Sequence, residues 1–321
     1  MKAARLYGIG DIRIEDIAEE ELHSDSVHVK VTAAGICGSD LHNFKTGQWL
    51  ASVPVTPGHE FCGTVVKTGS AVTKFAVGDQ VVADSRAYCG ECKPCLAGNH
   101  NYCDSLGFVG EVCNGGFAEF VTIKQDSLLK VPNEISANIA VLSEPLGVAL
   151  RVVNQLSIEP GCAVKIYGGG TIGGLTALLL KEVYGCVIDL VEPNADRMKL
   201  LAGIINIDTI EHYQYAVDAT GIPAVINQII TEIDAGGTVA LVGLPHTNSD
   251  IDILSVVERE VRLIGCSVFQ DEQQQVIKML GKLAPKLEKL ISAPFELQQI
   301  PEVYQSLTSG HVPYLKAVIQ P

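Results

Sequence analysis

The sequence predicts an α/β protein of two domains, a β-rich domain followed by a doubly wound parallel sheet. At 321 residues, the chain is about twice as long as a typical domain. Before residue 145, short β-like runs such as "VHVKVTAAG" and "AEFVTI" alternate with glycine, proline and aspartate turns, which is typical of all-β structure. After it, apolar strands such as "AVKIYG", "VIDLVEP" and "TVALVGLP" alternate with helical stretches, which predicts a parallel sheet covered on both faces.

Composition excludes some classes of partner. The net charge is −14 and the pI is about 5.0, which argues against nucleic acid, because phosphate binding needs a basic face. The start, "MKAARLYGIG", has no apolar core of a signal peptide. No run approaches the roughly 18 to 20 apolar residues that span a bilayer. We therefore expect a cytoplasmic protein with no membrane partner.

Four of the ten cysteines fall in one short loop, "AYCGECKPCLAGNHNYC". They are Cys89, Cys92, Cys95 and Cys103. A cytosolic chain keeps its thiols reduced, so this grouping favours a metal over disulfides. Zinc held by four thiolates needs loops that turn back, and Gly90 and Pro94 supply such turns. The alternatives are an iron–sulfur cluster, whose spacing differs after the third cysteine, and unliganded thiols. Four protein ligands leave no open position, so this zinc would be structural.

A second, open metal site could draw its ligands from separate parts of the chain. The candidates are Cys37 in "GICGSDLH", the pair His59 and Glu60 in "TPGHEFCG", and Glu144 in "LSEPLG". Glu144 stands among apolar residues, and a buried carboxylate is costly unless it is paired or bound to a metal. Taken singly, each is more often an ordinary core or surface residue. The residues alone therefore leave this site open.

The stretch "VKIYGGGTIGGL" contains the pattern Gly168-x-Gly170-x-x-Gly173 between a predicted strand and a helix. Glycines there let the backbone approach a pyrophosphate at the helix N-terminus. An acid, Glu192, ends the next strand, as a carboxylate that binds a ribose 2′-hydroxyl should. This favours NAD over NADP, although Arg197 leaves NADP open. A glycine turn without dinucleotide is the alternative. The candidate cofactor-binding residues are Gly168, Gly170, Thr171, Ile172, Gly173, Glu192 and Arg197.

Together, these motifs resemble the zinc-containing medium-chain alcohol dehydrogenase family, and most of all its polyol branch, the sorbitol dehydrogenase-like proteins. The resemblance covers nearly the whole chain in order. It runs through "GICGSDLH", "PGHEFCGTV", the four-cysteine loop, "GGFAEFV", "SEPLGVAL", "GGGTIG", "VDATG" and "TVALVG". It implies a GroES-like β-rich catalytic domain of residues 1–144 with 272–321, a Rossmann domain of residues 145–271, and a homodimer or homotetramer.

The resemblance assigns metal ligands to individual residues. Cys37 and His59 match two ligands of the family's catalytic zinc. Glu60 matches a neighbouring acid that ligates zinc in some members. Glu144 matches a glutamate of the polyol branch that binds zinc directly or through its water. The resemblance thus implies one catalytic and one structural zinc per chain.

The resemblance also implies a proton relay. Asp40 matches the acid that orients the zinc-binding histidine, a role that fixes the imidazole tautomer. Ser39 matches the hydroxyl that takes the proton of the substrate, and His42 matches the outer end of the relay. One departure is visible: the stretch "KLLAGIINIDTIEHYQY", residues 199–215, is shorter than usual, so we expect a peripheral helix of the Rossmann domain to be trimmed.

The expected function is a zinc-dependent oxidoreductase that transfers a hydride between a secondary alcohol of a polyol or sugar derivative and NAD. Alternatives within the family are dehydrogenases of simple alcohols, of threonine or of sugar acids, and relatives also act on phosphorylated hexitols. A zinc-free reductase of the superfamily and a non-catalytic dinucleotide-binding protein are further rivals. Phe108 and Trp49 could line a substrate cleft, although aromatic residues there could equally belong to the core.

Overall fold

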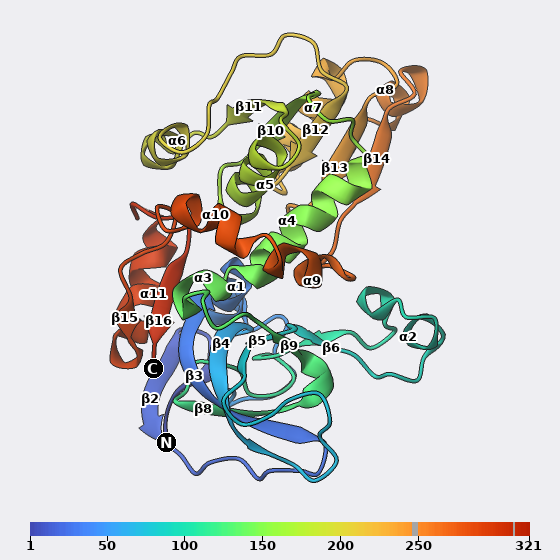
Figure 1. The fold of residues 1–321 in the computed structure, drawn as a ribbon. Helices are drawn as coiled ribbons and strands as arrows, with labels where there is room; N and C mark the ends of the chain where they lie inside the picture. Colours follow the sequence, from blue (N-terminus) through green and yellow to red (C-terminus); the bar gives the residue numbers. More distant parts are fainter. Residues whose placement is uncertain (246–249, 311) are drawn as a thin grey trace. The chain divides into compact units, whose positions relative to one another are not determined.

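A computed structural model describes residues 1–245, 250–310 and 312–321. The chain forms two compact units, one of Met1–Glu144 with Ile277–Pro321 and one of Pro145–Val276. Figure 1 traces the chain through both. The second crossing between the units lies five residues beyond the expected position at 271, because most of helix α9 (Glu272–Ile277) stays with the second unit.

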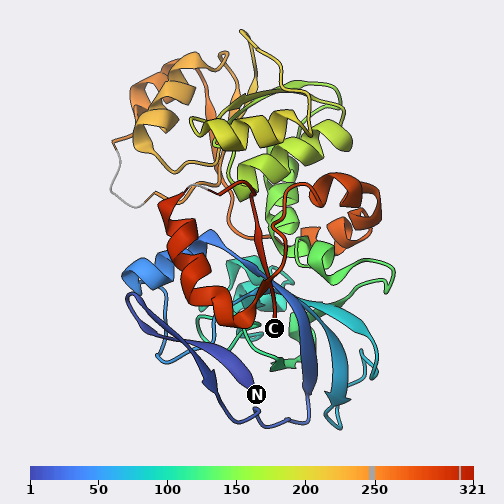
Figure 2. The same cartoon turned by 90° about the vertical axis from the view of Figure 1, so that its left-hand side faces the viewer.

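The first unit is built on a seven-stranded sheet in the order β15-β16-β3-β4-β5-β9, with β8 also paired to β3. Its strands are β3 (Ser26–Ile36), β4 (Glu60–Thr68), β5 (Gln80–Ala83), β8 (Phe120–Lys124), β9 (Leu128–Lys130), β15 (Phe295–Glu296) and β16 (Ala317–Gln320). β3 is central because β4, β8 and β16 all pair with it antiparallel. The C-terminal strand therefore lies beside the N-terminal part of the chain, as Figure 2 shows.

Smaller elements complete the first unit. Two-stranded sheets are formed by β1 (Lys2–Gly8) with β2 (Asp11–Asp16) and by β6 (Arg86–Ala87) with β7 (Gly107–Phe108). Its helices are α1 (Gly38–Thr46), α2 (Lys93–Leu96), α3 (Ala137–Ala140), α10 (Leu280–Leu287) and α11 (Ile300–Ser309), with 3-10 turns at His100–Tyr102, Gln125–Ser127 and Leu297–Gln299. Apolar side chains such as Val29, Phe61 and Phe117 fill the core under the large sheet, which is where strand alternation places them.

The second unit confirms the predicted parallel sheet. Its five strands pair in the order β11-β10-β12-β13-β14, and all four pairings are parallel. The strands are β10 (Ala163–Tyr167), β11 (Val187–Val191), β12 (Tyr215–Asp218), β13 (Thr238–Leu241) and β14 (Arg262–Gly265). The helices are α4 (Ser143–Leu156), which begins in the first unit, α5 (Thr171–Glu182), α6 (Ala195–Ala202), α7 (Pro223–Glu232) and α8 (Ile253–Glu258), besides α9.

The segment expected to be short connects α6 to β12. Residues 203–214 contain no helix or strand. One backbone bond, from Asp208 N to Ile188 O at 2.7 Å, ties the segment to β11. β11 is consequently an edge strand, and its Val187 and Val191 side chains are exposed.

One stretch, Ala137–Leu156, is long and apolar enough to cross a membrane by length and composition. Its most apolar window is 78% buried inside the protein. It also contains Glu144 and Arg151, so it is not the continuous apolar run that a spanning helix requires. The burial is that of a core helix in a globular protein.

Candidate functional site

Cys37 stands at the junction of β3 and α1. β3 carries the chain out of the sheet, and Cys37 caps the helix that follows, with its N–H donating to Asp40 Oδ2 at 2.8 Å. An acid three residues into a helix satisfies a backbone donor that has no partner within the helix. The motif "CGSD" therefore fixes the thiol and the carboxylate together at the start of α1.

His59 and Glu60 are brought to Cys37 by strand pairing. Glu60 is the first residue of β4 and stands opposite Gly35, two residues before Cys37. Ligand atoms of Cys37, His59 and Glu60 all lie within 4.8 Å of one another. His59 and Glu60 are 5% and 1% exposed. The structure thus gathers three of the four residues proposed for the open metal site.

Two buried atoms in this group have no hydrogen-bond partner within the described residues, His59 Nδ1 and Glu60 Oε2. Asp40 Oδ1 lies 3.8 Å from His59 Nδ1, within ion-pair range but too long for a hydrogen bond. Buried polar atoms normally find partners. A thiol, an imidazole and a carboxylate with unused capacity fit a zinc ion, which takes such ligands.

The electrostatics of the group also favour a cation. Burial alone would lower the pKa of His59, but Asp40 and Cys37 raise it well above its usual value. Glu144 lies outside the grouped ligand atoms in the described part of the chain, and its Oε1 accepts a hydrogen bond from Ser85 Oγ at 2.7 Å. Burial raises the pKa of Glu144 to about 7, and the charge of His59 opposes that rise. Glu144 is therefore close enough to act on the group without being a direct member of it.

Two residues that sequence reasoning missed support this group. Lys316 Nζ donates to Glu60 Oε1 at 2.7 Å and to Ile36 O at 3.0 Å. Tyr304 is fully buried, and its hydroxyl has no hydrogen-bond partner among the described residues. Burial first, and then the charges of Asp40 and Cys37, raise the pKa of Tyr304 well above its usual value. A lysine inside the apolar run "LKAVIQP" was the available signal for Lys316.

The proposed relay residues lie along α1. Ser39 is half-buried two residues after Cys37, and His42 follows on the next turn. The His42 ring stacks on Trp49 with centroids 4.2 Å apart, and its Nε2 lies 2.8 Å from Gln48 Oε1. These contacts hold the imidazole in place on α1, the helix that begins directly after Cys37.

The four loop cysteines form one cluster. Their sulfur atoms all lie within 4.8 Å of one another, and Cys89 and Cys103 are 3.6 Å apart. Tetrahedral zinc with bonds of about 2.3 Å separates its sulfurs by about 3.8 Å. Backbone N–H groups of Glu91 and Cys92 lower the pKa of Cys89 to about 6, which favours the thiolate that binds metal. The donor set and its spacing fit a structural zinc.

The glycine loop of the second unit has the geometry that a dinucleotide site needs. Gly168 follows β10 with φ of +99°, and Gly170 caps α5, which begins with Thr171 and Ile172. A Cβ atom on Gly173 would lie 1.9 Å from Gly168 O, so no other residue fits there. The loop therefore leaves backbone N–H groups at a helix N-terminus, where a pyrophosphate binds.

Glu192 has contacts that the sequence did not predict. Its Oε2 accepts a hydrogen bond from Gly169 N and its Oε1 one from Asn194 N, both at 2.7 Å. Arg197 Nη1 lies 3.4 Å from Glu192 Oε2. The carboxylate proposed for the ribose thus also ties the phosphate loop to the end of β11, and its charge is shared with Arg197.

Comparisons with known proteins agree with this geometry. A family model described as the alcohol dehydrogenase GroES-like domain matches residues 23–133, and one described as zinc-binding dehydrogenase matches residues 172–283. The (R,R)-butanediol dehydrogenase of Bacillus subtilis (strain 168) is 30% identical over 94% of each chain. The chain belongs to the zinc-containing medium-chain alcohol dehydrogenase family. It is a zinc-dependent oxidoreductase of the NAD(P)-dependent alcohol and polyol dehydrogenases.

Further relatives of this dehydrogenase point the same way. The sorbitol dehydrogenase of Bacillus subtilis (strain 168) is 28% identical over 100% of this chain and 97% of its own. A zinc-binding dehydrogenase from Sinorhizobium meliloti 1021, bound to NADP, superposes with a TM-score of 0.92 at 28% identity, over 100% and 99% of the chains. An Escherichia coli CFT073 alcohol dehydrogenase in complex with NADH superposes with a TM-score of 0.91 at 26% identity, over 100% of this chain and 99% of its own. Sorbitol and (R,R)-butanediol, for which two of these relatives are named, are small-molecule alcohols.

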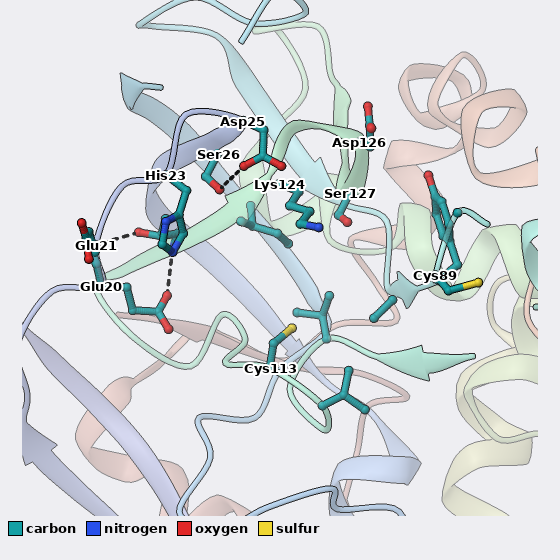
Figure 3. Close-up of a pocket in the computed structure, with 17 residues that line it drawn as sticks. Glu20, Glu21, His23, Asp25, Ser26, Cys89, Cys113, Lys124, Asp126 and Ser127 are labelled. Carbon is teal, nitrogen blue, oxygen red and sulfur yellow. Dashed lines mark hydrogen bonds between the residues drawn. The ribbon is translucent and has the colours of Figure 1, made fainter. Parts of the chain in front are cut away.

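The first unit of the dehydrogenase also has a pocket of about 780 Å³, and Cys89 of the cysteine cluster is among the residues that line it. Figure 3 shows Glu20, Glu21 and Asp25 at one side of it and Cys89 at the other. None of Cys37, His59 and Glu60 lines it. We assign no role in the reaction to this pocket.

Proposed function

We propose that the enzyme oxidises a secondary alcohol of a polyol or sugar derivative to a ketone and reduces NAD. The observation that carries this proposal is the grouping of Cys37, His59 and Glu60, with the buried carboxylate of Glu144 nearby. A metal environment with carboxylates is harder and more polar than one of thiolates alone, and it suits hydroxyl-rich substrates. The names of the sorbitol and butanediol dehydrogenase relatives support the same substrate class.

Cys37 and His59 would hold the catalytic zinc, with Glu60 and Glu144 as further carboxylates of the site. A bound zinc supplies Lewis acidity, which lowers the pKa of bound water from about 15.7 to about 7. A shift of that size corresponds to about 12 kcal/mol at about 1.36 kcal/mol per unit. Hydrogen bonds contribute about 1 to 3 kcal/mol each, so the side chains could not replace it.

The other residues would handle the proton and the charges. Ser39 accepts the proton of the substrate hydroxyl, and His42, held by Trp49 and Gln48, exchanges it with solvent. Asp40 orients His59 from 3.8 Å. These roles need only the spacing of side chains along α1 and their proximity to the ligand group.

The cofactor would be NAD rather than NADP. Gly168, Gly170 and Gly173 bring the backbone to the pyrophosphate, with Thr171 and Ile172 opening the helix. The carboxylate of Glu192 favours a ribose 2′-hydroxyl and repels a 2′-phosphate. Arg197 lies beside Glu192 and weakens this repulsion.

The proposal extends to organisation and location. The first unit would be the catalytic domain, which also carries a structural zinc on Cys89, Cys92, Cys95 and Cys103. The second unit would be the Rossmann domain. The location would be the reducing cytoplasm, where cysteine thiols stay available to bind metal. We propose a homodimer or homotetramer that binds neither nucleic acid nor membranes.

A substrate panel with NAD and NADP at fixed zinc tests the proposal. We expect turnover of polyols such as sorbitol or xylitol with NAD. Cys37→Ser should lose at least about 100-fold in kcat/KM, whereas Cys266→Ser, in the second unit, should keep the wild-type value. Full activity of Cys37→Ser would favour a zinc-free reductase. Binding of NAD without turnover of any alcohol would favour a non-catalytic dinucleotide-binding protein.

A further inference from the structure

Glu111 is a buried carboxylate that the reaction described above does not use. It lies just after β7, where its N–H donates to Phe108 O at 3.0 Å and its carbonyl accepts from Ala51 N at 3.2 Å. Only 8% of the residue is exposed. The two backbone bonds fix the start of its side chain, so the position of the carboxylate is set by the fold.

One oxygen of this carboxylate is tied to helix α1. Oε1 accepts a buried hydrogen bond from Asn43 Nδ2 at 2.9 Å. Asn43 lies one turn after Ser39, and its own Oδ1 accepts from Trp49 N at 3.1 Å. The structure gives Glu111 Oε2 no hydrogen-bond donor among the described residues. The carboxylate therefore has one satisfied oxygen and one with unused capacity.

Glu111 lies within electrostatic range of His59, one of the candidate metal ligands. It interacts electrostatically with His59 and Asp40, and the ring of Phe108, three residues earlier, has its centroid 6.5 Å from that of His59. Burial raises the pKa of Glu111 to about 7, while the charge of His59 and the Asn43 hydrogen bond lower it. No lysine or arginine in the described chain forms an ion pair with it.

The hydrogen bond to Asn43 does not explain why residue 111 is a glutamate rather than a neutral residue. A glutamine could accept the same hydrogen bond from Asn43 without the cost of burying an acid. Glu111 Oε2 is not among the fully buried side-chain atoms that lack a partner in the described chain, so this oxygen is accessible to a donor from outside the chain. A substrate with hydroxyl groups brings such donors to the region beside the metal ligands.

We propose that Glu111 is a specificity-determining residue whose free oxygen accepts a hydrogen bond from a second hydroxyl of the substrate, so that the site prefers diols and polyols to monohydric alcohols. This inference rests on the proposed oxidation of secondary alcohols. A site built to bond a hydroxyl discriminates strongly against an analogue that lacks it, because its own polar group is then left unpaired. The preference should therefore disappear when the acceptor is removed.

The test compares 2,3-butanediol, as separate stereoisomers, with 2-butanol, which lacks only the second hydroxyl. In the zinc-loaded enzyme with NAD, Glu111→Leu should lower kcat/KM for the preferred diol by about 10- to 100-fold and for 2-butanol by less than about 3-fold. Glu111→Gln keeps the bond to Asn43 and should lose less. Glu134→Leu, the same change at an exposed loop residue, should alter neither substrate.

Calorimetric titration of the diol into the zinc-loaded variants gives a readout independent of turnover and should show the same loss. If Glu111→Leu lost kcat/KM equally for both alcohols, or for neither, the proposal would be overturned, while the alcohol dehydrogenase function would stand. A wild-type enzyme that oxidises neither alcohol nor any polyol would refute the proposed function itself. Should Glu111→Leu fail to fold, the ratio of kcat/KM for the diol to kcat/KM for 2-butanol is measured for Glu111→Gln instead. A ratio below the wild-type value would support the proposal, and an unchanged ratio would overturn it.

Discussion

Lys316 Nζ donates a hydrogen bond to Glu60 Oε1 at 2.7 Å, although 256 residues separate the two in the chain. Both side chains are buried, with 2% and 1% exposed. Burial alone would lower the pKa of Lys316, and the charge of Glu60 raises it above its usual value. Lys316, the residue just before the C-terminal strand, thus supplies a cation to the buried side chain of Glu60 beside Cys37 and His59, while the second oxygen of Glu60 has no hydrogen-bond partner among the described residues.

Removing that cation should destabilise the first unit. Lys316→Met leaves Glu60 buried without its partner, and breaking a buried ion pair in this way costs about 3 to 5 kcal/mol. The free energy of unfolding, measured by urea denaturation of the zinc-loaded enzyme, should fall by that amount. Lys289→Met, the same change at an exposed lysine, should stay within about 0.5 kcal/mol of wild type.

The double variant identifies the cause. Lys316→Met with Glu60→Gln removes both charges, and we expect it to regain most of the lost stability because no unpaired charge remains buried. If the double variant were as unstable as Lys316→Met, the loss would come from packing of the lysine stem rather than from its charge.

The cysteine loop should account for one of two zinc ions per chain. Cys95 is 5% exposed and shares its cluster with three other thiols, so Cys95→Ser removes one of the four ligands grouped there among the described residues. We expect the zinc content measured by elemental analysis to fall from about two to about one ion per chain, with faster proteolysis within residues 89–103. Cys266→Ser should retain both ions. Unchanged zinc content in Cys95→Ser would contradict a four-thiolate site.

Local patterns were enough to predict much of the fold. Alternating apolar strands and helices indicated the parallel sheet from β10 to β14, and "GGGTIG" indicated the turn in which Gly173 approaches Gly168. The spacing of the loop cysteines indicated their cluster, because ligands close in sequence need only a turn to meet. In each case the signal lies within a few residues of the feature that it predicts.

Contacts between distant segments were harder to predict. Lys316 meets Glu60 only because β16 and β4 both pair with β3. The short sequence stretches around Glu60 and Lys316 do not indicate this strand order. Glu111 depends on Asn43, 68 residues away. Glu192 was expected at a ribose, but its hydrogen bond to Gly169 depends on how the end of β11 meets the loop after β10. Such partners follow from the register of paired elements, which hydrophobic patterns leave undetermined.

His28 should make the enzyme less stable in acid. Its ring is 3% exposed and stacks on Phe120, and burial lowers its pKa below the usual 6.5 although Glu19 opposes the shift. The unfolded chain then binds the proton more readily, so stability is lost as the pH falls below about 6.5. Urea denaturation between pH 7 and 5 should show a shallower loss for His28→Gln than for wild type. His23→Gln, at an exposed position, should lose stability with falling pH as steeply as wild type. If His28→Gln also lost stability as steeply as wild type, His28 would not be the cause of the acid sensitivity.

Glu192 should set the choice between the two nicotinamide dinucleotides. Its side chain is 3% exposed and accepts from Gly169 N, while Arg197 lies 3.4 Å away. Glu192→Ala removes the charge that repels a 2′-phosphate and leaves Arg197 unpaired, so the ratio of kcat/KM for NAD to that for NADP should fall at least about 10-fold. Asp196→Asn, which removes an exposed acid four residues away, should leave the ratio unchanged. Because Glu192 also holds the phosphate loop, some loss with NAD is expected in either case. A fall of equal size in kcat/KM with both cofactors would therefore mean that Glu192 acts only by holding the phosphate loop and does not contact the ribose.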